Sequence, residues 1–129
     1  AGAGASNTSA LAFGGYVPPA NKNETETWNG SNWTEVNNLN TARRSLGGLG
    51  TQSAAFAIGG YSTTQVGITE EWNGASWAEV ADLNTARSSA GAGGTTTNGL
   101  AFGGETPPVT AATEEWNVPS NLTKTVDTD

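Results

Sequence analysis

The residues of this chain that could do chemistry recur along the sequence instead of gathering in one segment. Three glutamates stand 44 residues apart (Glu26, Glu70 and Glu114), and Arg43 and Arg87 are separated by the same step. The glutamates could surround a cation, and the arginines could bind an anion. Regular spacing favours a structural role instead, with each arginine paired to a strand glutamate or to backbone carbonyls. The repeated glutamates and arginines are too regularly spaced to indicate a single asymmetric active site, so we expect no catalytic residues.

Cysteine and histidine are both missing from the 129 residues. Their absence excludes a thiolate nucleophile, an imidazole base, a disulfide and the usual zinc sites, and we expect no metal or other cofactor. The net charge is −7, and the five basic residues form no cluster, which argues against binding to nucleic acid or to anionic lipid. No apolar run is long enough to cross a bilayer.

Tryptophans follow the same 44-residue step. Trp28, Trp72 and Trp116 are each followed by Asn, and Trp33 and Trp77 come five residues after the first two. Such a row could stack against sugar rings. Residues that recur at every period usually serve the repeat itself, so we interpret these tryptophans as packing residues between neighbouring units.

The copies differ in the loops that follow each Gly-Gly pair, and binding residues concentrate on loops held by a rigid scaffold. Tyrosine, amide and hydroxyl side chains there would suit a polar ligand such as a glycan, although drift of loop sequence is the simpler explanation. The candidate ligand-binding residues are Tyr16, Asn21, Tyr61, Thr63, Gln65, Glu105 and Thr106.

The elements that carry these residues repeat as a unit of about 44 residues. In residues 38–81, a glycine-rich segment, an apolar run ending in Gly-Gly, an acidic segment ending in Trp72 and a segment around Trp77 each have the length and composition of a short strand. Asn73-Gly74 predicts a hairpin between the last two. We therefore expect an all-β fold with four-stranded units at residues 1–37, 38–81 and 82–129. The last strand of the third unit, at residues 121–126, is atypical because it has no tryptophan.

Four-stranded units of this length are typical of β-propeller blades, and the sequence pattern of the unit resembles that of kelch repeats. The resemblance rests on Gly59-Gly60 after an apolar strand, Glu70-Glu71-Trp72, Trp77, and the LNTAR segment at residues 83–87. Trp72 stands where kelch units more often carry tyrosine. Near-identical tandem copies of this kind are similar to kelch-like proteins of marine bacteriophage. That similarity implies a virion or other surface-associated, extracellular protein.

Three blades do not close a propeller, which typically has four to eight. We expect two chains to form a homodimer with one ring of six blades, because open end faces would expose apolar surface. The alternatives are a segment of a longer propeller and an open head-to-tail fibre. The chain contains no methionine, so we expect a processed chain or such a segment.

The expected function is a non-enzymatic interaction or structural module, used in adhesion, with glycan or receptor binding through the loops. One alternative is a propeller-type hydrolase, which would need converging carboxylates and an arginine cluster. Another is an intracellular protein–protein scaffold. The copper oxidase chemistry of some kelch-type propellers is excluded, because it needs cysteine.

Overall fold

The protein folds into three antiparallel sheets of four strands each. The computed structural model describes residues 1–117 and 122–126, which contain no helix and hence none that could cross a membrane. Within each sheet the strands lie in chain order. They are β1 (Gly2–Ser6), β2 (Ser9–Val17), β3 (Ala20–Trp28), β4 (Trp33–Val36), β5 (Gly47–Gly50), β6 (Ala55–Ile58), β7 (Thr69–Trp72), β8 (Trp77–Glu79), β9 (Gly91–Gly94), β10 (Asn98–Phe102), β11 (Thr113–Asn117) and β12 (Leu122–Val126).

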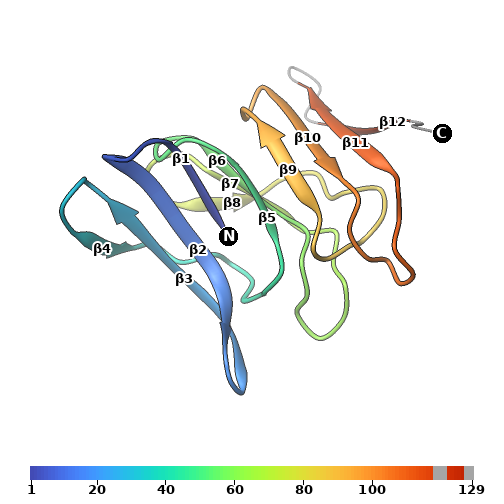
Figure 1. Ribbon diagram of the computed structural model, residues 1–129, viewed down its shortest axis with the longest axis horizontal. Helices are drawn as coiled ribbons and strands as arrows, with labels where there is room; N and C mark the ends of the chain where they lie inside the picture. The colour runs from blue at the N-terminus through green and yellow to red at the C-terminus, as the bar shows by residue number, and fades with distance from the viewer. Residues whose placement is uncertain (118–121, 127–129) are drawn as a thin grey trace.

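The predicted all-β class is confirmed, with four strands in each sheet. β1–β4, β5–β8 and β9–β12 form the first, second and third sheets, which follow one another along the long axis of the molecule (Figure 1). The linkers at residues 37–46 and 80–90 carry the chain from one sheet to the next. Residue 121, which the sequence analysis placed in the last strand, lies outside the described residues.

The hairpin predicted at each Asn-Gly pair is present, but its loop is longer than the two-residue Asn-Gly turn in which both residues have positive φ. Four residues, 29–32 and 73–76, separate the paired tryptophans, and among Asn29, Gly30, Asn73 and Gly74 only the glycines have positive φ (97° and 95°). Each asparagine instead accepts two backbone N–H donors through its side-chain oxygen, at 2.9 Å. The side chain closes the loop as an Asx turn, so the asparagine backbone stays in an ordinary conformation.

The first strand of each sheet lies against the first strand of the next, since β5 contacts both β1 and β9. This approach requires glycine at its closest point. A Cβ on Gly48 would lie 2.5 Å from the carbonyl oxygen of Gly2 and 2.8 Å from the ring of Phe13. The glycine-rich composition of these strands therefore allows three sheets to converge along one edge.

Two separate hydrophobic cores fill the spaces between the sheets. The first contains Leu11, Phe13, Leu39, Leu46, Ala55, Ala57, Trp72 and Trp77. The second contains Leu49, Phe56, Ile58, Leu83, Ala101 and Trp116. In each core the second strand of one sheet, β2 or β6, packs against tryptophans of the following sheet. Phe13 contacts Trp77 edge to face, and Phe56 contacts Trp116 in the same way.

The outer faces of the first and third sheets expose the counterparts of these core residues. Trp33 pairs with Trp28 as Trp77 pairs with Trp72, but Trp33 is 48% exposed and Trp77 only 6%. At the other end Phe102 is 45% exposed, whereas Phe13 in the same register is 2% exposed. Leu100, beside Phe102, is exposed as well. Trp33 is exposed because no sheet lies against the outer face of the first sheet in this structure, so its role in packing between units stays a prediction.

Candidate functional site

Two groups of the predicted site residues lie at the junctions between sheets, and the first is the arginine segment LNTAR. We call residues 39–43 and 83–87 the arginine clasps. The backbone of the first clasp is held by the first sheet, where Leu39 N–H donates to Asn23 O (2.9 Å) and Arg43 N–H donates to Lys22 O (3.0 Å). Gly15 N–H donates in turn to Arg43 O (2.9 Å). The segment thus extends the edge of the sheet that precedes it.

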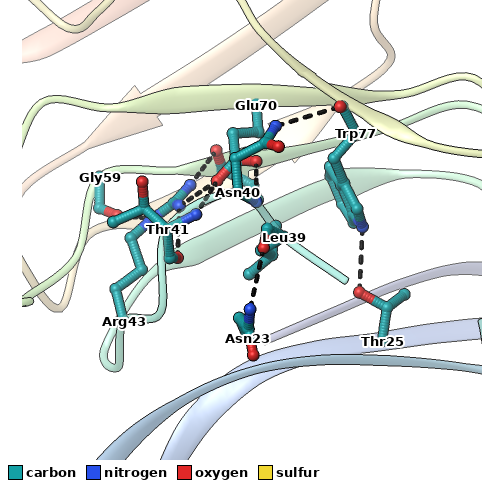
Figure 2. Close-up of polar contacts among 10 residues, drawn as sticks. Asn23, Thr25, Leu39, Asn40, Thr41, Arg43, Gly59, Glu70 and Trp77 are labelled. Atoms are coloured by element: carbon teal, nitrogen blue, oxygen red, sulfur yellow. Dashed lines mark hydrogen bonds and ion pairs between the residues drawn. The ribbon is translucent and has the colours of Figure 1, made fainter. Parts of the chain in front are cut away.

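The side chain of Arg43 crosses into the second sheet. Its guanidinium donates to Glu70 Oε2 (2.5 Å), to Gly59 O (2.8 Å) and to Ala57 O (3.0 Å). Glu70 also accepts the N–H of Asn40 at 2.7 Å (Figure 2). Arg43 and Glu70 are both fully buried. A buried charge pair is tolerated when further hydrogen bonds satisfy both groups, and these contacts do so.

The second clasp repeats the arrangement at the next junction. Arg87 pairs with Glu114 at 2.7 Å and donates to the carbonyls of Gly103 (3.2 Å) and Ala112 (2.8 Å). Glu114 accepts the N–H of Asn84 at 2.6 Å. Both arginines therefore donate their hydrogen bonds to acceptors within the protein. This is the structural role that the regular spacing favours over anion binding.

The three repeated glutamates do not form one site. Glu70 and Glu114 are buried against arginine, whereas Glu26 is exposed on the first sheet. Within residues 1–117, as the structure describes them, no cluster of three or more acidic side chains could hold a metal ion. Glu71, the neighbour of Glu70 in β7, is partly exposed, because successive side chains of a strand point to opposite faces.

The second group contains two tyrosines and one arginine, which come from the end of β2, from the loop after Gly59-Gly60 and from the linker between the first two sheets. The guanidinium of Arg44 lies over the rings of both Tyr16 and Tyr61, 4.5 Å and 4.6 Å from their centroids. Arg44 also forms a backbone bridge with Tyr61, with N–H···O distances of 3.0 and 2.8 Å. We call Tyr16, Arg44, Tyr61 and Asn21 the tyrosine–arginine cluster. Cation–π contact with two rings holds the guanidinium in place, while its N–H groups can still donate hydrogen bonds.

Asn21, in β3, connects the first sheet to the loop that carries Tyr61 and to Arg44. Its side-chain oxygen accepts a hydrogen bond from Arg44 at 3.2 Å, and its side-chain nitrogen donates to Ser62 O at 2.7 Å. Thr63 is exposed near the tip of the second loop, and Gln65 pairs with Tyr61 at its base. The structure thus brings five of the seven candidate residues close together, but only Tyr61, Thr63 and Gln65 lie on a loop. The loop predicted after Gly14-Gly15 is wrong, because the strands continue past the glycines and Tyr16 of β2 pairs with Asn21 of β3.

The other two candidates lie in the corresponding loop of the third sheet. Glu105 occupies the position of Tyr61 and pairs with Ser88, as Tyr61 pairs with Arg44. The hydroxyl of Thr106 donates to Pro108 O within its own loop, at 2.9 Å. An aromatic–arginine stack cannot form at this junction, because serine and glutamate replace arginine and tyrosine.

Arg44 is the residue of the cluster that sequence reasoning missed. Its signal was a difference between the copies: Arg43-Arg44 in the first linker becomes Arg87-Ser88 in the second. The same criterion that selected the loops after Gly-Gly would have selected Arg44. It was overlooked because it lies next to a repeated arginine and outside those loops.

Comparison with known proteins adds information on the fold. No model of a known protein family matches the sequence, and no curated protein matches it. Among solved structures, the chain is similar to the structure of YjhT, with a TM-score of 0.79 and 11% sequence identity. The similarity covers 98% of this chain and 45% of the YjhT chain, so this chain spans less than half of that length. At this identity the likeness concerns the fold alone.

Proposed function

We propose that the protein is a non-enzymatic β-propeller interaction module of the kelch-like kind, in which a second copy of the chain completes a ring of six blades. The observation that carries this proposal is the pair of apolar end faces. Trp33 on the first sheet and Leu100 and Phe102 on the third are exposed, although their counterparts inside the molecule are buried. Monomeric proteins rarely leave such groups together in water, and a contiguous apolar patch usually marks an interface.

The two end faces are complementary by the construction of the repeat. The outer face of the third sheet corresponds to the face of the second sheet that receives Trp116. The outer face of the first sheet corresponds to the face that brings Trp72 and Trp77 against its neighbour. The third sheet of one copy can therefore pack on the first sheet of another. Two such contacts related by a two-fold axis would close the ring.

A polar ligand, such as a glycan on a cell surface or receptor, is proposed for the tyrosine–arginine cluster. Tyr16 is 46% exposed and offers a ring face beside a fixed guanidinium. Aromatic rings with nearby hydrogen-bonding groups suit sugar rings, which have apolar faces and polar edges. This role agrees with a virion or other extracellular surface protein used in adhesion. The buried carboxylates Glu70 and Glu114 are saturated by arginine, which supports a binding role over hydrolysis.

A glycan array probed with the purified chain tests the ligand proposal. Spots bound by the wild type should be lost with Tyr16→Ala combined with Tyr61→Ala, because both ring faces disappear. The control is Val109→Ala, an exposed position in the loop of the third sheet, which should bind unchanged. Binding that survives the double substitution would reject this site, and an array without bound spots would favour a purely structural role.

Arg44→Lys separates the shape of the cluster from its charge. Lysine keeps the positive charge but loses the planar group that lies over the two rings. We expect binding to weaken by about tenfold, as for loss of one charge-assisted hydrogen bond, with an unchanged circular dichroism spectrum. Equal affinity for the lysine variant would show that the guanidinium does not contact the ligand.

A further inference from the structure

We propose that a hollow on the first sheet binds the guanidinium group of a further arginine-bearing segment of the Leu-Asn-Thr-Ala-Arg type. The hollow encloses about 460 Å³, and Ala12, Gly14 and Glu26 are among the residues that line it. This inference goes beyond the proposed ring and ligand, and it does not depend on either.

Strand register identifies the hollow as the counterpart of the two filled arginine sites. In each sheet a glutamate on the third strand pairs with an alanine on the second strand. The three pairs are Glu26 with Ala12, Glu70 with Ala57, and Glu114 with Ala101. In each sheet a glycine with positive φ follows two residues after that alanine: Gly14, Gly59 and Gly103.

The acceptors that hold Arg43 have direct equivalents around the hollow. Arg43 is bound by the carboxylate of Glu70 and by the carbonyls of Ala57 and Gly59. The equivalent residues of the first sheet are Glu26, Ala12 and Gly14, and all three line the hollow. The site therefore presents the same acceptor set to an incoming guanidinium, one anion and two carbonyls, which matches the donor fork of arginine.

Burial distinguishes the filled sites from the unfilled one. Glu70 and Glu114 are 0% and 1% exposed, whereas Glu26 is exposed and belongs to none of the three ion pairs found in the described part of the chain. The arginines already in the molecule are committed elsewhere, two in the clasps and Arg44 over the tyrosine rings. The guanidinium for this site must come from another segment.

The backbone of a clasp explains why the occupant is a segment of this pattern and not a lone cation. Glu70 accepts the N–H groups of Asn40 and Thr41 at 2.7 and 3.4 Å. Glu114 accepts those of Asn84 and Thr85 at 2.6 and 3.3 Å. Each buried carboxylate is thus satisfied by two backbone donors together with the guanidinium. Glu26 would receive all of these donors only from a chain segment that follows the same path, with backbone N–H groups three and two positions before its arginine.

The spacing of the filled sites permits a direct test. Arg43 and Arg87 each stand four residues before the first residue of the inner strand, Gly47 and Gly91. In the first sheet Ala1 occupies the position of Gly47 and Gly91. Its amino group donates to Phe13 O, and its carbonyl accepts from Phe13 N–H. Residues 83–90, which contain a single arginine, can therefore be grafted ahead of Ala1 in the correct register.

The experiment compares thermal unfolding of this graft with that of a matched graft in which the arginine is replaced by glutamine. The arginine graft should have a Tm at least about 5 °C higher, as expected for a buried charge-assisted pair. Glu26→Gln should abolish the difference between the two grafts. Equal Tm values for the two grafts, or a difference that persists with Glu26→Gln, would overturn the proposal. Light scattering on the same samples reports the ring separately, so failure of one proposal is distinguishable from failure of the other.

Discussion

At the scale of single residues, the clasp arginines and their glutamates are the polar groups on which the sheet junctions depend. Each pair is buried, and each charge is balanced only by its partner and by backbone groups. Replacing one member of such a pair leaves the other charge without compensation in a poorly solvated place. The loss is therefore larger than the net contribution of the intact pair.

Glu70→Gln should lower the free energy of unfolding by about 3 kcal/mol, because the buried guanidinium of Arg43 loses its counter-charge. Urea unfolding followed by tryptophan fluorescence measures the change. The control is Glu26→Gln, the same substitution at the equivalent exposed position, which should change stability by about 0.5 kcal/mol or less. Equal effects of the two substitutions would contradict the role assigned to the clasp.

Two equivalent threonines should respond in opposite directions to the same substitution. Trp77 Nε1–H donates to Thr25 Oγ1 at 3.0 Å in the first junction, whereas in the second junction Thr69 Oγ1 is buried with no partner among the described residues. Thr25→Val should destabilise the protein by about 1–2 kcal/mol, because it orphans the indole N–H. Thr69→Val should stabilise it by about 1 kcal/mol, because it removes an unsatisfied hydroxyl. Changes of the same sign in urea unfolding would refute this assignment.

At the scale of elements, the inner strands β1, β5 and β9 decide how closely the sheets approach. β5 has neighbours on both sides, so it has the least room for side chains. Glycine in a strand is normally a weakness, because it adds entropy to the unfolded chain and has no side chain to pack. Here the close approach of backbones offsets that weakness.

Gly48→Ala and Gly93→Ala form a matched test of this crowding. A Cβ at Gly48 would meet the backbone of Gly2 and the ring of Phe13, whereas one at Gly93 would have nothing within 4 Å. We expect Gly48→Ala to cost about 1–3 kcal/mol from overpacking. Gly93→Ala should be neutral or slightly stabilising, because it restricts the unfolded chain. Thermal unfolding followed by circular dichroism measures the Tm of each variant. Equal Tm values for the two variants would contradict the packing described for β5.

At the scale of the whole molecule, the decisive property is that the end sheets are built like the inner one. The sequence places the same residue types at the free faces and at the buried junctions. Nothing local makes the outer sheets self-sufficient in the way that a polar capping repeat would. The proposed ring follows from this property.

The ring predicts a molar mass in solution of twice 13.1 kDa by light scattering. Trp33→Asp and Phe102→Asp each place a charge on one end face, so either should convert the dimer to a monomer of 13.1 kDa. Val109→Asp, at a loop position that is 78% exposed, should leave the mass unchanged. A wild-type monomer would reject the two-copy ring, and larger species that grow with concentration would indicate the head-to-tail fibre.

Much of the fold was predictable because the repeat fixes the local pattern three times over. The strand around residues 55–58, the acidic strand ending at Trp72 and the loops after Gly-Gly in the second and third sheets followed from composition and alternation. In the first sheet the loop was placed wrongly, because the strands continue to Val17 and restart at Ala20. The form of the Asn-Gly turns did not follow, because the asparagine side chain closes those loops. The tyrosine–arginine cluster was predicted only in part. Tyr16, Asn21 and Tyr61 were among the candidates, but Tyr16 and Asn21 lie in strands and Arg44 comes from a linker.

The sequence by itself determined the number and the kind of the units, since a 44-residue period and a two-residue alternation are properties of the chain alone. Only the tertiary structure decided which copies of each motif are satisfied. Trp33 and Trp77 stand in similar sequence, and so do Glu26 and Glu70, yet one of each pair is exposed and the other buried. The physical reason is that burial and ion pairing are supplied by the neighbouring sheet, and the first sheet has no neighbour on its outer side.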